Sequence, residues 1–191
     1  MKSNAIKTNI MLIAITSFIG FCFEDIWMIF RHGVLDNRNM YLPFLLGYGL
    51  FVVALYYIFG TPKKLFNKYE FKGSIIVYYI LCFFLVSIGE LLLGLFVEKT
   101  GGYSYWDYSS IPLHITKYTS IPTSIGFALI ITLFMNYVFI PLQSKVEKLV
   151  SRIPLPVVVL ILVALIIDFF ISFKTMYTNN GKNTLWKIYF R

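Results

Sequence analysis

The chain has 191 residues, of which 58% are hydrophobic and only 14% are charged, and its mean hydropathy is +0.74. A soluble domain of this size cannot bury so much apolar surface in one core, so the composition excludes an ordinary soluble protein. The net charge of +8 does not indicate nucleic acid as a partner, because the basic residues lie between apolar runs, where membrane lipids account for them. The runs are continuous rather than alternating, which favours helices over a membrane barrel.

Five apolar runs follow one another along the chain, and each is long enough for a helix that crosses about 30 Å of hydrocarbon. They cover residues 10–30, 43–60, 73–97, 121–142 and 154–173. We therefore predict an all-α integral membrane helix bundle with about five transmembrane helices, which forms a single domain over residues 1–191 and has no internal repeat. The connection 143–152 is predicted to be a short amphipathic segment, and the aromatic and basic tail 185–191 to lie on the membrane surface.

Lysine and arginine indicate the orientation of the chain. Nine lie in the N-terminal head and in the loops after the second and fourth runs, and eight lie on the opposite side, four of them in the tail. Early loops usually dominate orientation, so we expect a cytoplasmic N-terminus and an outer C-terminus. The richness in Ile, Lys, Asn, Phe and Tyr indicates an AT-rich bacterial genome, so we place the protein in the bacterial plasma membrane.

Several carboxylates lie inside apolar runs, where an ionisable side chain is costly and therefore a candidate for function. Glu24, Glu90 and Asp168 lie at similar depth in the first, third and fifth runs. Helical spacing places small residues on the same faces as these carboxylates. The faces comprise Ser17, Gly20 and Glu24; Ser87, Glu90 and Gly94; and Ala164, Asp168 and Ser172. This pattern predicts an acidic cavity that opens outward between three helices, with Arg31 and Arg38 at its rim to neutralise the carboxylates or to hold an anionic ligand.

Polar residues in membrane helices also serve packing alone, and this alternative stays open. Asp25 and Glu98, near the ends of their runs, are expected to reach the headgroups or to pair with Arg31 and Arg38. Asp168 fits either a structural or a ligand-binding role. Asn136 is expected to make an interhelical hydrogen bond.

The sequence contains no phosphate-binding loop, no H-E-x-x-H, no G-x-S-x-G and no C-x-x-C. Any ATPase that works with this chain must therefore be a separate protein. The spacing of His32 and His114 fits no metal pattern, and neither does that of the two cysteines. We predict no metal and no cofactor, and an enzymatic activity is left open but not favoured.

Several segments together resemble a known family. They are Gly20-Phe21-Cys22-Phe23-Glu24, the segment 36–43, Gly47-Tyr48-Gly49, the pair Glu90 and Gly94, and Tyr105-Trp106-Asp107-Tyr108-Ser109. Over residues 18–130 the chain resembles the ABC-transporter type IV family of bacterial membrane proteins, also called CmpB-like permeases. The resemblance implies a shared site formed by Glu24, Asn37, Arg38, Glu90, Trp106 and Asp107. Asn39 departs from the family pattern, which usually has glycine there.

Three functions follow from these observations. The leading one is a permease-like or substrate-binding subunit whose polar cavity takes a small solute, beside a separate ATPase or other membrane subunit. The second is a membrane-embedded enzyme or accessory factor for lipid-linked envelope precursors, with Glu24 or Glu90 as the acid–base group and Arg38 on the phosphate. The third is a structural or regulatory membrane partner without a ligand.

Overall fold

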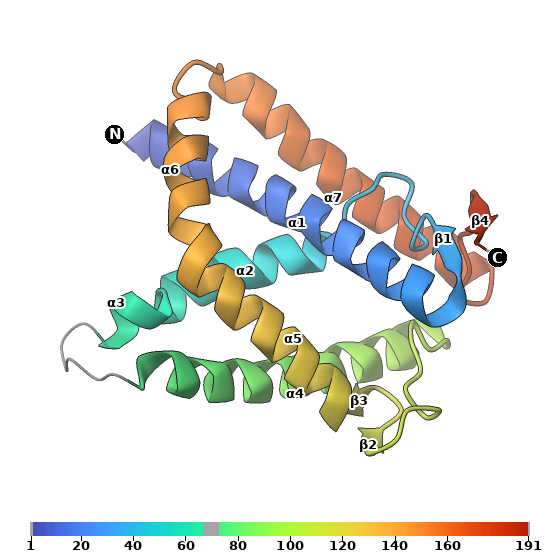
Figure 1. Cartoon of the computed structure of the whole chain (residues 1–191). Coiled ribbons are helices and arrows are strands. Elements are labelled where there is room, and N and C mark those ends of the chain that lie inside the picture. The colour runs from blue at the N-terminus through green and yellow to red at the C-terminus, as the bar shows by residue number, and fades with distance from the viewer. Residues whose placement is uncertain (1, 67–72, 191) are drawn as a thin grey trace. The chain divides into compact units, whose positions relative to one another are not determined.

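The computed structural model describes residues 2–66 and 73–190, and most of them are helical (Figure 1). The elements in chain order are α1 (Lys2–His32), β1 (Val34–Asp36), α2 (Leu46–Phe59), α3 (Pro62–Phe66), α4 (Ser74–Gly101), β2 (His114–Thr116), β3 (Thr119–Ser120), α5 (Ile121–Leu133), the π-helix η1 (Phe134–Val138), α6 (Phe139–Val150), α7 (Leu155–Thr178) and β4 (Lys187–Tyr189). The strands form two separate two-stranded sheets. The prediction of an all-α bundle is confirmed, because each of the five apolar runs contains a helix.

Four helical segments of the described chain are long and apolar enough to cross a membrane: Ser3–His32, Ser74–Gly101, Ile121–Val150 and Leu155–Thr178. The third of these is α5, η1 and α6 in continuous succession, so residues 143–150 extend the fourth run instead of forming the separate segment that we expected. Helix α2 has 14 residues, which makes it about 21 Å long at 1.5 Å per residue. It ends at Phe59 because Gly60 adopts a left-handed conformation with φ +73°.

Contacts divide the chain into two compact units. Unit 1 consists of Met1–Tyr57 with Leu142–Arg191, and unit 2 of Ile58–Pro141. In unit 1, α1 lies beside α7 (Figure 1). A small core of Ala14 from α1, Leu46 from α2 and Leu165 from α7 joins the three helices. The single domain that we expected over the whole chain stays a prediction.

The two ends of unit 1 show that α1 and α7 run parallel. At one end β1, directly after α1, pairs antiparallel with β4, so that Val34 lies opposite Tyr189. The tail, which we expected only to lie on the membrane surface, is therefore tied to the loop after α1. At the other end the Lys7 ammonium group donates hydrogen bonds to the carbonyl oxygens of Val150 (2.7 Å) and Ile153 (3.1 Å), between α6 and α7.

This pairing has a consequence for the number of membrane crossings. Because β1 follows α1 and β4 follows α7, the C-terminal ends of these two helices lie on the same side of the membrane. An even number of crossings must therefore separate them. Helix α4, the run from α5 to α6, and α7 are each long and apolar enough for one crossing, so we infer that α2 supplies the fourth.

Lys7 is expected to be a main determinant of stability. Its side chain is almost fully buried, at 6% exposure, and its ammonium group satisfies two carbonyls at the end of α6. Replacing it in Lys7→Met should lower the free energy of unfolding by about 2–3 kcal/mol, because hydrogen bonds from a charged donor are lost. Thermal unfolding in detergent measures this, with Lys148→Met on the exposed side of α6 as the control. Equal stability of the two variants would contradict the role of Lys7.

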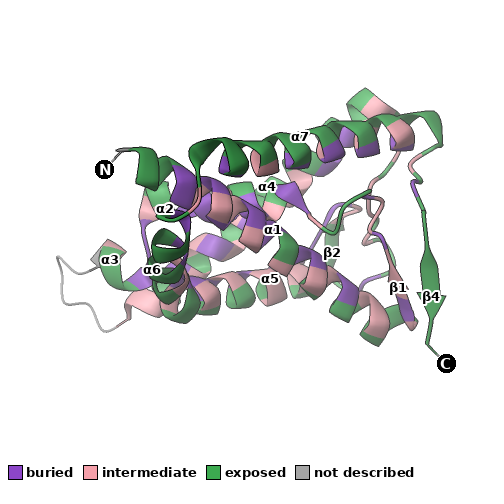
Figure 2. Cartoon of the chain, turned by 90° about the horizontal axis from the view of Figure 1, so that it is seen from above, coloured by how far each residue is buried: buried purple, intermediate pink, exposed green. Residues whose placement is uncertain are grey.

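In unit 2, α4 packs against α5. The fully buried side chains of the described part of the unit include Tyr78 and Cys82 from α4, Ala128 from α5, Met135 from η1 and Phe139 from α6. Other apolar side chains of α4 are 56–63% exposed, namely Ile76, Phe84, Leu92 and Phe96. Figure 2 shows similar exposed faces on α7 in unit 1. Exposed apolar surface of this extent is unfavourable in water and suits contact with lipid chains.

Helices α1 and α4 are both followed by a glycine at which the helix ends. The Gly33 amide donates to the Ile29 carbonyl after α1, and the Gly102 amide donates to the Glu98 carbonyl after α4, each at 2.9 Å. Both glycines have positive φ angles, +61° and +72°, which allow the chain to leave the helix in a left-handed turn. The loops that follow these two turns carry most of the remaining site residues.

Candidate functional site

A charged cluster lies where α1 ends in unit 1. The Arg38 Nε atom lies 2.8 Å from Asp36 Oδ1 and 3.5 Å from Asp25 Oδ1. Asp25 is buried on α1, with 5% exposure, while Asp36 is the last residue of β1. Asp25 therefore pairs with an arginine, which is one of the two outcomes that we expected for it. Because Arg38 already has two carboxylate partners, its charge is neutralised within the protein.

The backbone at this cluster is strained. Arg38 and Asn39 both have positive φ angles, +47° and +60°, although neither is glycine. The Asp36 carboxylate holds this turn, because its Oδ1 atom also accepts a hydrogen bond from the Arg38 amide at 2.9 Å. Asparagine tolerates the left-handed region better than most residues, which explains how Asn39 replaces the glycine of the family pattern. Strain of this kind persists where surrounding contacts enforce it and is concentrated at functional sites.

Glu24 is held by a tyrosine from the next helix. The Tyr48 hydroxyl donates to Glu24 Oε1, and the Tyr48 ring covers Gly20 one turn earlier on α1. A Cβ atom at Gly20 would lie 2.6 Å from Tyr48 Cγ, so only glycine leaves room for the ring. The shared face of Gly20 and Glu24, predicted from helical spacing, is thus the face on which α2 packs.

Asn37 and Asp168 bind backbone groups. The Asn37 amide nitrogen donates to the carbonyls of Met40 (2.7 Å) and Asn183 (2.8 Å), and its oxygen accepts from the Leu185 amide at 3.0 Å. Asn37 therefore connects the loop after α1 to the C-terminal tail.

Asp168, on α7, fixes the next part of the same loop. Its Oδ1 atom accepts from the amides of Tyr41 (3.0 Å) and Leu42 (2.9 Å). The Ser172 hydroxyl, one turn further along α7, also accepts from the Tyr41 amide, at 3.2 Å. Both side chains therefore lie on one face of α7, as their spacing indicated.

Arg31 is placed differently from Arg38. It lies in the last turn of α1, is exposed, and its guanidinium group lies 6.0 Å from the centre of the Trp27 ring. This geometry is a cation–π contact at the surface. The structure thus separates the two arginines that we expected together at the rim of a cavity, because Arg38 forms buried ion pairs and Arg31 contacts an aromatic ring.

The other three predicted site residues belong to unit 2. Glu90 Oε1, on α4, accepts a hydrogen bond from the Tyr108 hydroxyl at 3.1 Å. The Trp106 ring nitrogen donates to the Tyr118 carbonyl at 3.0 Å, and the two rings meet edge to face at 5.9 Å. The Trp-Asp-Tyr segment therefore folds back onto α4 and onto the hairpin of β2 and β3.

Asp107 and Lys117 lie at the exposed edge of this loop. Hydrogen bonds from the hydroxyl and amide of Ser109 lower the pKa of Asp107, which marks a local turn. Lys117 forms an ion pair with Glu98, and its hydrogen bond to that carboxylate raises the pKa of Lys117. Glu98 thus pairs with a lysine of its own unit and not with Arg31 or Arg38, although pairing with these arginines was one of the two outcomes that we expected for it.

The two units share a local arrangement of glycine, glutamate and tyrosine, which our sequence analysis did not identify. Gly94 and Glu98 on α4 have the spacing of Gly20 and Glu24 on α1. The Tyr118 ring covers Gly94, as Tyr48 covers Gly20, and the Tyr118 hydroxyl hydrogen-bonds Glu98. The recurrence of Gly-x-x-x-Glu near the end of two long helices was the sequence signal for this relation.

The sequence analysis identified the acidic residues but not the side chains that bind them. The missed residues are Tyr48, Tyr108, Lys117 and Tyr118. Asn136, for which we expected an interhelical hydrogen bond, lines a cleft in unit 2. Within residues 2–66 and 73–190, no group of three His, Cys, Asp or Glu side chains is arranged to hold a metal ion.

Four long apolar helices with polar clusters at their ends define an integral membrane protein of the multi-pass class. Residues 11–173 match the family described as "Putative ABC-transporter type IV". This match covers most of the chain, so the protein belongs to that family. No curated protein and no solved structure matches the chain.

Proposed function

We propose that the protein is a permease-like or substrate-binding subunit that binds a small solute at the polar cluster after α1. The observation that carries the proposal is the strained turn at Arg38 and Asn39, which sits beside the buried carboxylate of Asp25 in an apolar span. Buried charge and backbone strain both lower stability, and a protein retains them together most readily where they serve binding. An ATPase, supplied by a separate chain, would provide the energy.

The charges in this cluster favour a solute that carries a positive charge. Glu24, Asp25 and Asp36 bring three carboxylates to the end of α1 and the strand after it, and Arg38 neutralises part of this charge. An anionic ligand would have to compete with carboxylates that already hold Arg38. This reasoning replaces the anion clamp that we considered for the arginines. The cavity between three helices stays a prediction.

The contacts of Asn37 and Asp168 indicate that these two side chains position the loop and do not contact the solute. Both bind backbone amides or carbonyls of the loop after α1, and such contacts hold a loop in place whether or not a solute is present. We therefore assign solute contact to Glu24 and Asp25, and loop positioning to Asn37 and Asp168.

The test measures thermal unfolding of the purified protein in detergent with a panel of amines, cationic vitamins, nucleosides, metal cations and envelope precursors. A solute present at 100 times its dissociation constant should stabilise the native state by about 2.7 kcal/mol. The stabilisation should disappear in Glu24→Gln and Asp25→Asn, and persist in Glu147→Gln, where the same chemical change occurs at an exposed position of α6.

Two outcomes would count against the proposal. If the solute stabilised Glu24→Gln and Glu147→Gln equally, it would bind elsewhere. If no member of the panel stabilised the protein and the first two variants lost stability without any solute, the cluster would be structural, and a partner protein without a ligand would be the better description.

A further inference from the structure

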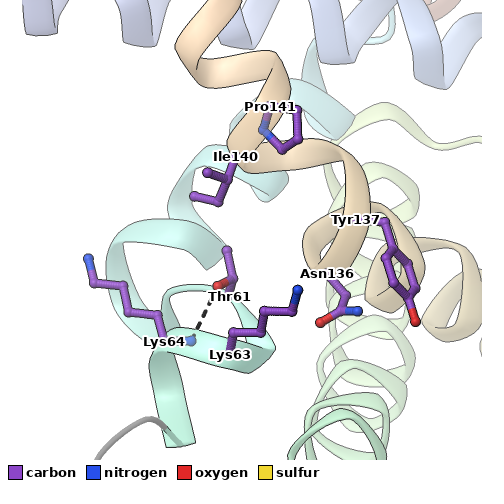
Figure 3. A pocket seen from close by; sticks show the side chains of 7 residues that line it. All are labelled: Thr61, Lys63, Lys64, Asn136, Tyr137, Ile140 and Pro141. Atoms are coloured by element: carbon purple, nitrogen blue, oxygen red, sulfur yellow. Dashed lines mark hydrogen bonds between the residues drawn. The ribbon is translucent and has the colours of Figure 1, made fainter.

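Unit 2 contains a cleft of about 490 Å³ that is separate from every residue assigned above (Figure 3). One wall is formed by Thr61, in the turn after α2, with Lys63 and Lys64 of α3, and the other by η1 and the start of α6. On that second wall Asn136 and Tyr137 belong to η1. Single turns of π-helix inside long helices are rare and frequently mark functional positions.

The turn that forms the first wall is held in place. The Tyr78 hydroxyl, fully buried on α4, donates to the Gly60 carbonyl at 2.9 Å. Thr61 is buried as well, and its hydroxyl accepts from the Lys64 amide at 3.3 Å at the start of α3. The two lysines therefore project from a short helix whose start is held by these hydrogen bonds.

The lining combines positive charge with apolar surface. Figure 3 shows the Lys63 side chain pointing toward Asn136, with Lys64 turned to the other side of α3. Tyr137 and Ile140 are 62% and 43% exposed and present apolar surface next to these polar groups. Because Lys63 and Lys64 follow directly on the apolar helix α2, the cleft lies where hydrocarbon gives way to headgroups.

We propose that this cleft binds the headgroup of an anionic phospholipid. The Lys63 ammonium group contacts the phosphate and Lys64 adds positive charge nearby, the Asn136 amide donates to a headgroup oxygen, and the upper part of an acyl chain lies against Tyr137 and Ile140. A basic pocket between membrane helices suits such a lipid. A soluble phosphate compound would leave the apolar wall without a partner, which is why the lipid is the favoured occupant.

The experiment counts bound lipids by native mass spectrometry of the protein in a neutral detergent. Phosphatidylglycerol is added to the natural chain and to Lys63→Gln/Lys64→Gln, with Lys145→Gln/Lys148→Gln as the control. The control lysines are exposed on α6 and lie in a second basic segment. Each cleft lysine should contribute about five-fold to affinity, so the first double variant should bind about 30-fold more weakly and the control should bind like the natural chain.

Further measurements distinguish lipid binding in the cleft from attraction by general surface charge. Asn136→Leu should weaken phosphatidylglycerol binding several-fold without removing any charge, and phosphatidylcholine should bind weakly to all variants. Equal losses in the two lysine pairs would show that only the surface potential matters and would overturn the proposal. Displacement of the lipid by soluble glycerol phosphate at similar concentration would overturn it too, because the occupant would then be a free phosphate compound. Thermal unfolding without added lipid confirms that every variant is folded.

Discussion

The variant Gly49→Ala is expected to lower the free energy of unfolding by about 2–3 kcal/mol. Gly49 lies on α2 where it meets α1, and a methyl group there would overlap the Ile13 carbonyl oxygen and the Ser17 hydroxyl. The Ile13 oxygen is a backbone atom within α1, so no side-chain rotation relieves the overlap. The two helices would have to separate, and the small core around Ala14 and Leu46 would open.

Gly47→Ala provides the matched control on the same helix. A Cβ atom at Gly47 meets no atom within 4 Å, and alanine favours a helix over glycine by about 1 kcal/mol. This variant should therefore be as stable as the natural protein or slightly more so. Thermal and dodecyl sulfate unfolding in detergent measure both effects. Similar stabilities for the two alanine variants would contradict the close packing of α1 and α2.

Asp168→Ala is the second substitution with a large expected effect. It removes the acceptor for the Tyr41 and Leu42 amides, and the Leu42 amide is then left without the partner that it has in this structure. Both hydrogen bonds are partly buried and their acceptor is a carboxylate, and a hydrogen bond to a charged group contributes about 1.5–3 kcal/mol, so we expect a loss of about 2 kcal/mol. The loop after α1, which holds Arg38, should become more accessible to protease.

Asp168→Asn separates the structural role from a direct role in ligand binding. The asparagine keeps an oxygen at the position of Oδ1, so stability should fall by less than about 1 kcal/mol. If Asp168 only positions the loop, this variant should also keep the solute stabilisation proposed above. Loss of that stabilisation in a fully stable Asp168→Asn protein would instead place Asp168 in contact with the solute.

The ends of α1 and α4 have similar local structures but differ in how well they support a solute site. Each has a glycine one turn before a glutamate and a tyrosine over that glycine. At α1 the neighbouring carboxylate, Asp25, is buried and pairs with Arg38. At α4 the ion pair of Glu98 and Lys117 is more exposed to solvent. A solute site is therefore better supported at α1, where solvent screens charge less.

The sequence by itself determined the class of the protein, because hydropathy and helical period depend only on neighbouring residues. Long apolar runs predicted the membrane helices, and spacing of three and four residues predicted shared faces. The face of Asp168 and Ser172 is an example, since both accept a hydrogen bond from the Tyr41 amide. The family resemblance was also visible, because it depends on short local segments.

The tertiary structure alone decided which partner each polar residue has. Lys7 entered the sequence analysis only as a basic residue of the N-terminal head, yet it binds the carbonyl of Val150, 143 residues away. Tyr48 and Tyr118 carried no local sign of covering Gly20 and Gly94, and the pairing of the tail with β1 joins the two ends of the chain. Such contacts depend on how helices pack, and periodicity along one helix carries no information about which residue of another helix will face it.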